Sequence, residues 1–429
     1  MTEIHRLCTL LLILFAFLLS GCGPKQLPGW GDSRPATTAP AAATGPAAQS
    51  APAINPYPAQ ASGMTPPPPA TAMPAAKVAI LLPLSGQHAA IGQAMLQSAQ
   101  LALFDLGFDS LELMPLDTKG SPDGAVQAAS AALNNGAQLI LGPLFAEEVK
   151  AVKGVTAPRN INVIAFSTDW SIAGGNTYLM GFMPFSQIER ITQYAAAKGI
   201  RSAGIIAPQD TYGETATRLF EQKSAQSGIA ITERFRFPPN SQDLTNRLKD
   251  FTHYDPAQDP HQDGGRPQVP YQAVFMPVGG SQGEMLATSL SYYGLRPDVV
   301  QKLGTGLWDD PRIAVQPQMQ GAWFAAPSPR NRRMFEDKYR RAYGQTPPRL
   351  ASLAYDAAAL SIVLAKTGLQ RNGRPSYDRP ALTNPNGFAG MDGIFRFRAN
   401  NLVERGLSVI EIRNRNFVEI DPAPRTFQQ

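Results

Sequence analysis

One motif in the sequence is typical of a catalytic serine. Residues 279–283, Gly-Gly-Ser-Gln-Gly, match the G-x-S-x-G spacing of a nucleophile elbow and lie between a predicted strand and a predicted helix. In that architecture the acid and the histidine follow the serine in the chain. All the histidines here precede Ser281, namely His5, His88, His253 and His261. We therefore expect a tight turn, in which glycine lets the backbone bend closely, and no enzyme.

An aromatic residue and two carboxylates follow a glycine-rich stretch later in the chain. Trp308, Asp309 and Asp310 come directly after Gly-Thr-Gly-Leu at residues 304–307. These side chains could face a cleft, and capping of a following turn is an equal alternative. The sequence contains neither a phosphate-binding nor a dinucleotide-binding glycine motif, and no spacing typical of metal ligands. We expect no cofactor and no metal site.

Six basic residues lie in or just before a predicted helix at residues 332–343. They are Arg330, Arg332, Arg333, Lys338, Arg340 and Arg341, interrupted by Glu336 and Asp337. Such a face is usually solvated. The alternative is a docking patch for an acidic partner or for an anionic cell-wall polymer.

The composition is that of a soluble globular protein with more than one domain. The chain has 429 residues, of which 43% are hydrophobic and 17% charged. Its net charge of +5 is small for this length, and no long run of lysine and arginine forms a stripe for phosphates, so we expect no nucleic acid partner. Both cysteines, Cys8 and Cys22, lie near the start, which excludes a disulfide further along the chain.

The first 21 residues are typical of a bacterial signal peptide. His5 and Arg6 precede an apolar run at residues 7–19, which ends in Leu19-Ser20-Gly21-Cys22. This ending resembles the lipobox of bacterial lipoproteins, which implies acylation of Cys22; an ordinary signal peptide with an accidental cysteine is the alternative. The resemblance also implies an outer-membrane destination facing the periplasm, because Gly23, and not aspartate, follows the cysteine.

Residues 22–76 have a composition that opposes folding. They are rich in proline, alanine, threonine, glycine and glutamine, and their charged residues are Lys25, Asp32 and Arg34. Such a segment buries too little apolar surface to offset the entropy of ordering. We expect a disordered, partly polyproline tether between the lipid anchor and the folded part.

The chain beyond residue 76 alternates strand and helix signals. Strands are predicted at 78–84, 111–116, 138–141, 162–166, 202–206, 229–235 and 273–277, with short ones at 302–304 and 322–325. Helices are predicted at 89–106, 122–133, 147–157, 187–198, 213–227, 241–251, 283–293, 332–343 and 349–366. The repeated βα pattern predicts an α/β protein with doubly wound parallel sheets. About 350 residues exceed one such core, so we expect two lobes.

Several stretches together resemble the type 1 periplasmic-binding-protein superfamily, the group of the leucine-binding proteins. The stretches are KVAILLPLSG from Lys77, LGPLF from Leu141, NVIAFST from Asn162, IIAPQDTYGE from Ile205, VFMPVGG from Val274 and SLAYDA from Ser352. The resemblance implies two α/β lobes, with a ligand cleft between them and a chain that passes back and forth. We expect an N-terminal lobe of residues 77–184 and 328–400 and a C-terminal lobe of 185–327 and 401–429.

A narrower resemblance is to alphaproteobacterial penicillin-binding-protein activator lipoproteins. It rests on LGTGLWDDP from Leu303, PPRLASLAYDA from Pro347 and NPNGFAGMDGIFRF from Asn384. It implies stimulation of peptidoglycan synthesis by contact with an inner-membrane synthase. The alternative is the substrate-binding component of an amino-acid or amide ABC transporter.

The sequence departs from the amino-acid binders of the superfamily at the residues that hold a zwitterion. Ala146 stands where they carry a small hydroxyl residue, and Gly306 lies in the loop where they commonly carry an acid. An unpaired buried ligand charge is costly, so we expect weak binding of leucine-type ligands. A small polar ligand is possible, and the candidate cleft-lining residues are Ser85, Phe145, Thr168, Asp169, Tyr212, Ser281, Trp308 and Asp309.

Overall fold

The structure, a computed structural model, describes residues 76–427 except 240, 242–243 and 256–267. The predicted signal peptide, Cys22 and residues 22–75 of the predicted tether lie outside these residues. Ala76, placed at the end of the tether, is the first residue of strand β1. Within the described residues, every helix is too short or too polar to cross a membrane.

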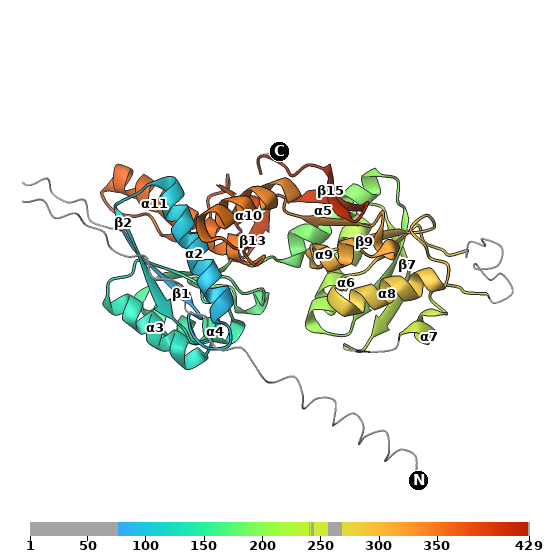
Figure 1. The fold of residues 1–429 in the computed structure, drawn as a ribbon, viewed down its shortest axis with the longest axis horizontal. Helices are drawn as coiled ribbons and strands as arrows, with labels where there is room; N and C mark the ends of the chain where they lie inside the picture. Colours follow the sequence, from blue (N-terminus) through green and yellow to red (C-terminus); the bar gives the residue numbers. More distant parts are fainter. Residues whose placement is uncertain (1–75, 240, 242–243, 256–267, 428–429) are drawn as a thin grey trace, which may run out of the picture. The chain divides into compact units, whose positions relative to one another are not determined.

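The first sheet is parallel, with the order β2-β1-β3-β4-β5. Its strands are β1 (Ala76–Leu82), β2 (Leu111–Asp117), β3 (Leu139–Leu141), β4 (Asn162–Ala165) and β5 (Thr177–Leu179). The crossover helices are α2 (Ala89–Leu106), α3 (Pro122–Asn134) and α4 (Ala146–Thr156), and α3 packs against α4 (Figure 1). All residues of β1 except Lys77 are buried, as expected for a strand covered on both faces.

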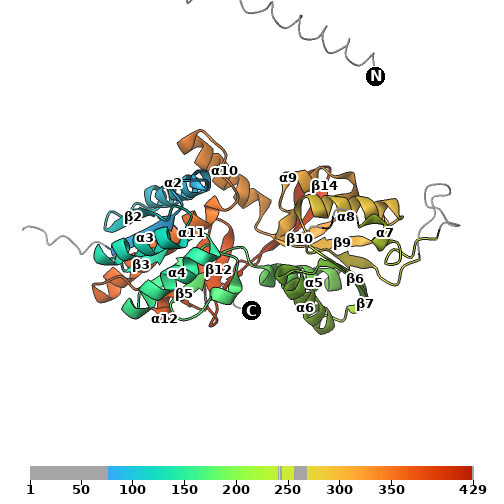
Figure 2. The same cartoon turned by 90° about the horizontal axis from the view of Figure 1, so that it is seen from below.

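The second sheet is mixed, with the order β15-β14-β10-β9-β8-β6-β7. Its parallel strands are β6 (Ser202–Pro208), β7 (Ala230–Phe237), β8 (Ala273–Phe275), β9 (Gln301–Gly304) and β10 (Trp323–Ala326). Strands β14 (Ser408–Arg413) and β15 (Asn416–Asp421) add antiparallel pairs. Helices α5 (Pro184–Ala197) and α6 (Thr211–Gln226) cover one face, and α8 (Gly280–Tyr292) covers the other (Figure 2).

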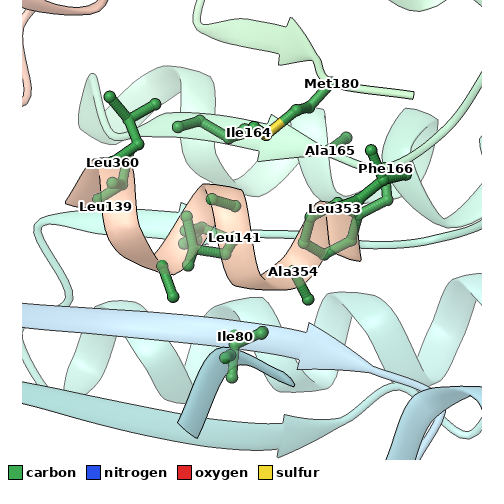
Figure 3. Close-up of a cluster of buried hydrophobic side chains, with 14 of the residues drawn as sticks. Ile80, Leu139, Leu141, Ile164, Ala165, Phe166, Met180, Leu353, Ala354 and Leu360 are labelled. Carbon is green, nitrogen blue, oxygen red and sulfur yellow. The ribbon is translucent and has the colours of Figure 1, made fainter. Parts of the chain in front are cut away.

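The chain returns to the first sheet after β10. Helices α10 (Pro329–Tyr343) and α11 (Ala351–Asn372) follow, and α11 packs closely against α2. Figure 3 shows Leu353, Ala354 and Leu360 of α11 beside Leu139 and Leu141 of the sheet. The core of the first lobe therefore combines side chains from residues 76–183 with others from residues 335–403.

A small third sheet completes the passage back to the second lobe. It is antiparallel, with β11 (Phe388–Gly390), β12 (Gly393–Phe397) and β13 (Val403–Arg405), and β13 leads directly into β14. Among the described residues, the remaining α-helices have four residues each: α7 (Thr245–Leu248), α9 (Pro311–Ala314) and α12 (Arg379–Leu382).

Two parts of the fold differ from the sequence-based expectation. The helix predicted at residues 241–251 shrinks, among the described residues, to the single turn α7. Strands β5 and β11 to β15 were not predicted, because they are short or follow turn-rich segments without a clear period of two. The parallel two-lobed architecture itself is confirmed.

Candidate functional site

A cavity of about 690 Å³ lies where loops of both lobes meet. Its walls come from the segments after β4, β5, β6, β9 and β10, together with the residues that precede α11. Ligands of open α/β sheets bind outside the carboxyl ends of the strands, and this cavity has that position. The lining residues are Thr168, Asp169, Trp170, Ser171, Phe182, Pro184, Gln187, Thr211, Tyr212, Gly306, Leu307, Asp309, Ala326, Pro327, Arg349 and Leu350.

Four of the eight candidate cleft residues line this cavity together. Thr168 and Asp169 follow β4, Tyr212 starts α6, and Asp309 follows the 3-10 turn Gly306–Trp308. They come from loops far apart in the sequence, which the carboxyl ends of the parallel strands bring to one place.

Ser85 and Phe145 lie outside the cavity lining. The hydroxyl of Ser85 donates to Asp117 Oδ2 at 2.6 Å. Burial raises the pKa of Asp117, but this hydrogen bond and those from nearby backbone N–H groups more than offset it, and the net change is a lowering. The ring of Phe145 packs on that of His88, with 4.7 Å between the centroids. Both residues hold the loops after β1 and β3 in place.

Trp308 is a core residue, which corrects the expectation that it faces the cleft. Its side chain is fully buried, and its indole Nε1–H donates to the carbonyl of Val278 at 2.8 Å. Gly304 makes room for the ring: a Cβ on Gly304 would lie 2.4 Å from the indole. The glycine at position 304 therefore leaves the space in which the Trp308 ring packs beneath its own loop.

Ser281 is also absent from the cavity lining. It is exposed in the first turn of α8, one residue after Gly280, whose φ of 58° lies in the left-handed region that favours glycine. The backbone conformation of this turn therefore accounts for Gly280 without a catalytic role for Ser281. The histidines in the described part of the chain are His88, which packs on Phe145 in the first lobe, and His253, whose Nε2 lies 2.6 Å from Glu233.

Asp309 is held by two arginines from the other lobe. Its Oδ1 accepts from Arg332 Nη1 of α10 at 2.7 Å, and its Oδ2 accepts from Arg349 Nε at 3.0 Å. The side chain of Asp309 is 10% exposed, and those of the arginines are 23% and 22% exposed. The pairs therefore act in a partly desolvated setting, where charge-assisted hydrogen bonds are stronger than at an open surface.

Arg349 connects this pair to a second carboxylate. Its Nη1 lies 3.1 Å from Asp392 Oδ1, and Asp392 also accepts from the hydroxyl of Ser352 at 2.6 Å. Burial lowers the pKa of Arg349, but the carboxylates of Asp392 and Asp309 more than offset this, and the net change is a rise. The guanidinium also stacks over the ring of Phe182, 4.2 Å from its centroid.

A second acid–base pair lies deeper, behind Phe182. Asp356 of α11 and Arg405 at the end of β13 are both buried, with 3.6 Å between Oδ2 and Nη1. Burial raises the pKa of Asp356 to about 7; the charge of Asp392 adds to the rise and Arg405 opposes it. Asp356 also accepts from the backbone N–H of Met391 at 2.5 Å.

The uncharged polar groups on the second-lobe wall are bonded within the protein as well. The amide Oε1 of Gln187 accepts from the N–H of Gly306 at 2.7 Å, and the hydroxyls of Tyr212 and Thr305 lie 3.0 Å apart. Burial raises the pKa of Tyr212 to about 12, so its hydroxyl stays neutral near pH 7. On the wall formed by the first lobe, the carboxylate of Asp169 accepts from the hydroxyl of Ser171 at 2.6 Å.

The arrangement is one of a binding cavity whose charges are already balanced. Asp309 and Arg349 form an ion pair. Asp169 accepts a hydrogen bond from the backbone N–H of Ser171, and its Oδ2 lies 4.0 Å from Lys150 Nζ. Trp170, Phe182, Leu307 and Leu350 supply apolar walls. Within the described residues, no group of three or more histidine, cysteine, aspartate or glutamate side chains could hold a metal ion.

Sequence reasoning missed the arginines and the aromatic side chain that organise this site. Arg349 and Arg405 are separated by more than 50 residues and come close only in the fold. The stretch NPNGFAGMDGIFRF from Asn384 did contain a signal for the buried carboxylate of Asp356. A Cβ on Gly390 would lie 2.6 Å from Asp356 Oδ2, so this position requires glycine, and Asp392 follows two residues later. That motif surrounds the buried carboxylate.

Comparison with known proteins gives a family, and two of the relatives that match part of the chain are named as activators. A family model described as "Periplasmic binding protein" matches residues 75–416. The chain is 27% identical over 185 residues to the penicillin-binding protein activator LpoA of Glaesserella parasuis, and 29% identical over 153 residues to that of Photobacterium profundum. These alignments cover 42% and 35% of this chain, but 28% and 24% of the relatives, so the chain matches about a quarter of their length.

A solved structure with the same fold is the periplasmic ligand-binding protein of a branched-chain amino acid ABC transporter from Burkholderia xenovorans. The TM-score is 0.63, with 17% sequence identity, 82% of this chain covered and 97% of that protein covered. At this identity the likeness concerns the fold.

Proposed function

We propose a function from the premise that this chain belongs to the periplasmic binding protein family: it is a cell-envelope lipoprotein that activates a peptidoglycan synthase by protein contact, without catalysing a reaction itself. The partial relatives named as penicillin-binding protein activators support this assignment. The lipobox-like ending at Cys22 supports a lipid anchor, and Gly23 supports the outer membrane as its location.

The observation that carries the proposal is the internal pairing of the charges at the cavity. A receptor for a free amino acid needs an acceptor for the ammonium group and donors for the carboxylate. Here the carboxylate of Asp309 already has Arg332 and Arg349, and Arg349 also pairs with Asp392. A zwitterion would have to break these pairs and leave partly buried charges uncompensated, which costs on the order of 1–3 kcal/mol.

The same pairs favour a protein that presents a fixed surface. Asp309 belongs to the second lobe, whereas Arg332 belongs to α10 and Arg349 lies just before α11. The bonds therefore tie together the two lobes that would separate during ligand uptake. A contact activator benefits from such rigidity, because its binding surface is formed before the partner arrives.

The alternative is the binding component of an amino-acid or amide importer, which the structural neighbours support. The two functions differ in their membrane partner. The mature protein, tagged at its C-terminus, is used as bait on detergent-solubilised membranes from its own cells, and synthases and permease subunits are quantified by mass spectrometry. A control bait carries residues 22–75 on an unrelated domain. We expect enrichment of a synthase over this control; enrichment of permease subunits instead contradicts the proposal.

A further inference from the structure

Helix α10 has an outer face that is rich in arginine and contains one apolar side chain. Residues three and four apart share a face of a helix. The exposed residues at this spacing, here named the α10 face, are Arg330, Arg333, Met334, Asp337, Arg340 and Arg341. Met334 is 50% exposed in the middle of the arginines.

The charges of the α10 face are mostly uncompensated. Asp337 pairs with Arg340, with 2.9 Å between Oδ1 and Nη1. Arg330, Arg333 and Arg341 form no ion pair with any described residue. Four arginines thus face one aspartate, and the face has an excess of positive charge that attracts an anionic group.

The opposite side of α10 holds the helix in place. Phe335 and Tyr339 are buried, and the hydroxyl of Tyr339 donates to the side chain of Gln97 in α2. Lys338 Nζ lies 2.6 Å from Asp105 of α2, and Arg332 bonds Asp309 at the cavity. The α10 face is therefore preformed on a helix fixed along its length, and a partner would bind it with little ordering cost.

We propose that the α10 face docks an acidic segment of a protein partner, with an apolar side chain of that segment against Met334. This inference rests on the proposed function and places the protein contact on one surface. Arginine binds carboxylates with two parallel hydrogen bonds, which a lysine cannot do. Arginine and methionine are enriched at protein interfaces and lysine is depleted, and the one lysine of α10 points to Asp105. An anionic glycan would offer no apolar group to Met334.

The test places a photo-crosslinking amino acid at position 334 of the full-length protein in cells. The attached peptide is then identified by mass spectrometry. We expect a segment rich in aspartate and glutamate, and we expect the adduct to disappear in the double variant Arg333→Glu/Arg341→Glu. The matched control is Arg371→Glu/Arg374→Glu, which reverses two exposed arginines at the end of α11 that also form no ion pair with any described residue. Unchanged melting temperatures establish that both double variants fold.

A synthetic peptide of the identified segment provides the second measurement. The Arg333→Glu/Arg341→Glu variant should bind it about tenfold more weakly, and a peptide with two acids replaced by lysine should recover binding to that variant. An acidic segment from a synthase supports both this inference and the proposed function. An acidic segment from another envelope protein supports the α10 face and contradicts the synthase assignment. A glycan adduct, a lipid adduct or no adduct at all overturns the inference.

Discussion

The Oδ2 atom of Asp309 accepts a hydrogen bond from Arg349 Nε at 3.0 Å, although 40 residues separate the two in the sequence. Asp309 follows a turn of the second lobe, and Arg349 stands just before α11, which packs in the core of the first. This bond, with that from Arg332, balances the charge at the cavity and ties the lobes together.

Replacing Asp309 with asparagine should destabilise the protein. The change leaves Arg332 and Arg349 with one fewer counter-charge in a partly buried place, and we expect a loss of about 1–3 kcal/mol in the free energy of unfolding. Urea denaturation followed by circular dichroism measures it.

The neighbouring Asp310 provides the control. Its partner Arg312 is 71% exposed, so the ion pair contributes little, and asparagine can still cap α9 as Asp310 does. Asp310→Asn should change the free energy of unfolding by less than about 0.5 kcal/mol. Equal losses in the two variants would contradict a special role for Asp309.

The stability of the protein should depend on pH through Asp356. Its pKa in the folded state is raised to about 7 from the ordinary value of 3.8, by burial first and by Asp392 second. Between these values the folded protein holds a proton that the unfolded chain has lost, so this group makes stability fall as pH rises from about 4 to about 7. Above that range its contribution is constant.

The variant Asp356→Asn isolates this effect, because asparagine does not titrate. Urea denaturation of both proteins at several pH values between 4.5 and 8 gives the difference in the free energy of unfolding. We expect the advantage of the wild type over the variant to shrink as the pH rises. A difference that stays constant across the range would show that Asp356 titrates normally.

Ser281 should be dispensable for stability and function. Its side chain is exposed at the start of α8, so Ser281→Ala should change the free energy of unfolding by less than about 0.5 kcal/mol. A fluorophosphonate probe should leave the wild type unlabelled. Covalent labelling at Ser281, lost in the alanine variant, would instead identify a nucleophile.

Free leucine, isoleucine, valine and glutamate should not bind tightly in the cavity. Asp309 and Arg349 already neutralise one another, and Gly306 of the cavity lining offers no side chain for the ammonium group of an amino acid. Isothermal titration calorimetry of the mature protein tests each compound. A dissociation constant near micromolar, or about 8 kcal/mol of binding, for any of them would favour the importer alternative.

The sequence was informative where apolar residues form continuous runs. The run after Lys77 predicts a buried strand, and helix 89–106 has the predicted bounds of α2. Strands β11, β12 and β13 were not predicted because each has only three to five residues, too few for a clear alternation of apolar and polar side chains.

The site was harder to predict because its organisation depends on long-range pairs. Thr168, Asp169, Tyr212 and Asp309 follow strands whose carboxyl ends meet, and that rule places them at the cavity. Trp308 belongs to the same loop as Asp309, but its ring packs in the core, in the space that Gly304 leaves open. Nothing local in the sequence pairs Arg349 with Asp309, since the choice of partner is made by the packing of α11.

If this protein activates a peptidoglycan synthase by contact, as we propose, the rate of glycan-strand polymerisation by the purified synthase should respond to it. The mature protein is titrated into the reaction, with the Arg333→Glu/Arg341→Glu variant in parallel. We expect the initial rate to rise severalfold and saturate with the wild type, and the variant to need about tenfold more protein for the same rise. A rate that stays at the level of the synthase alone, at concentrations well above those of the two proteins in the cell, would contradict the proposed activation.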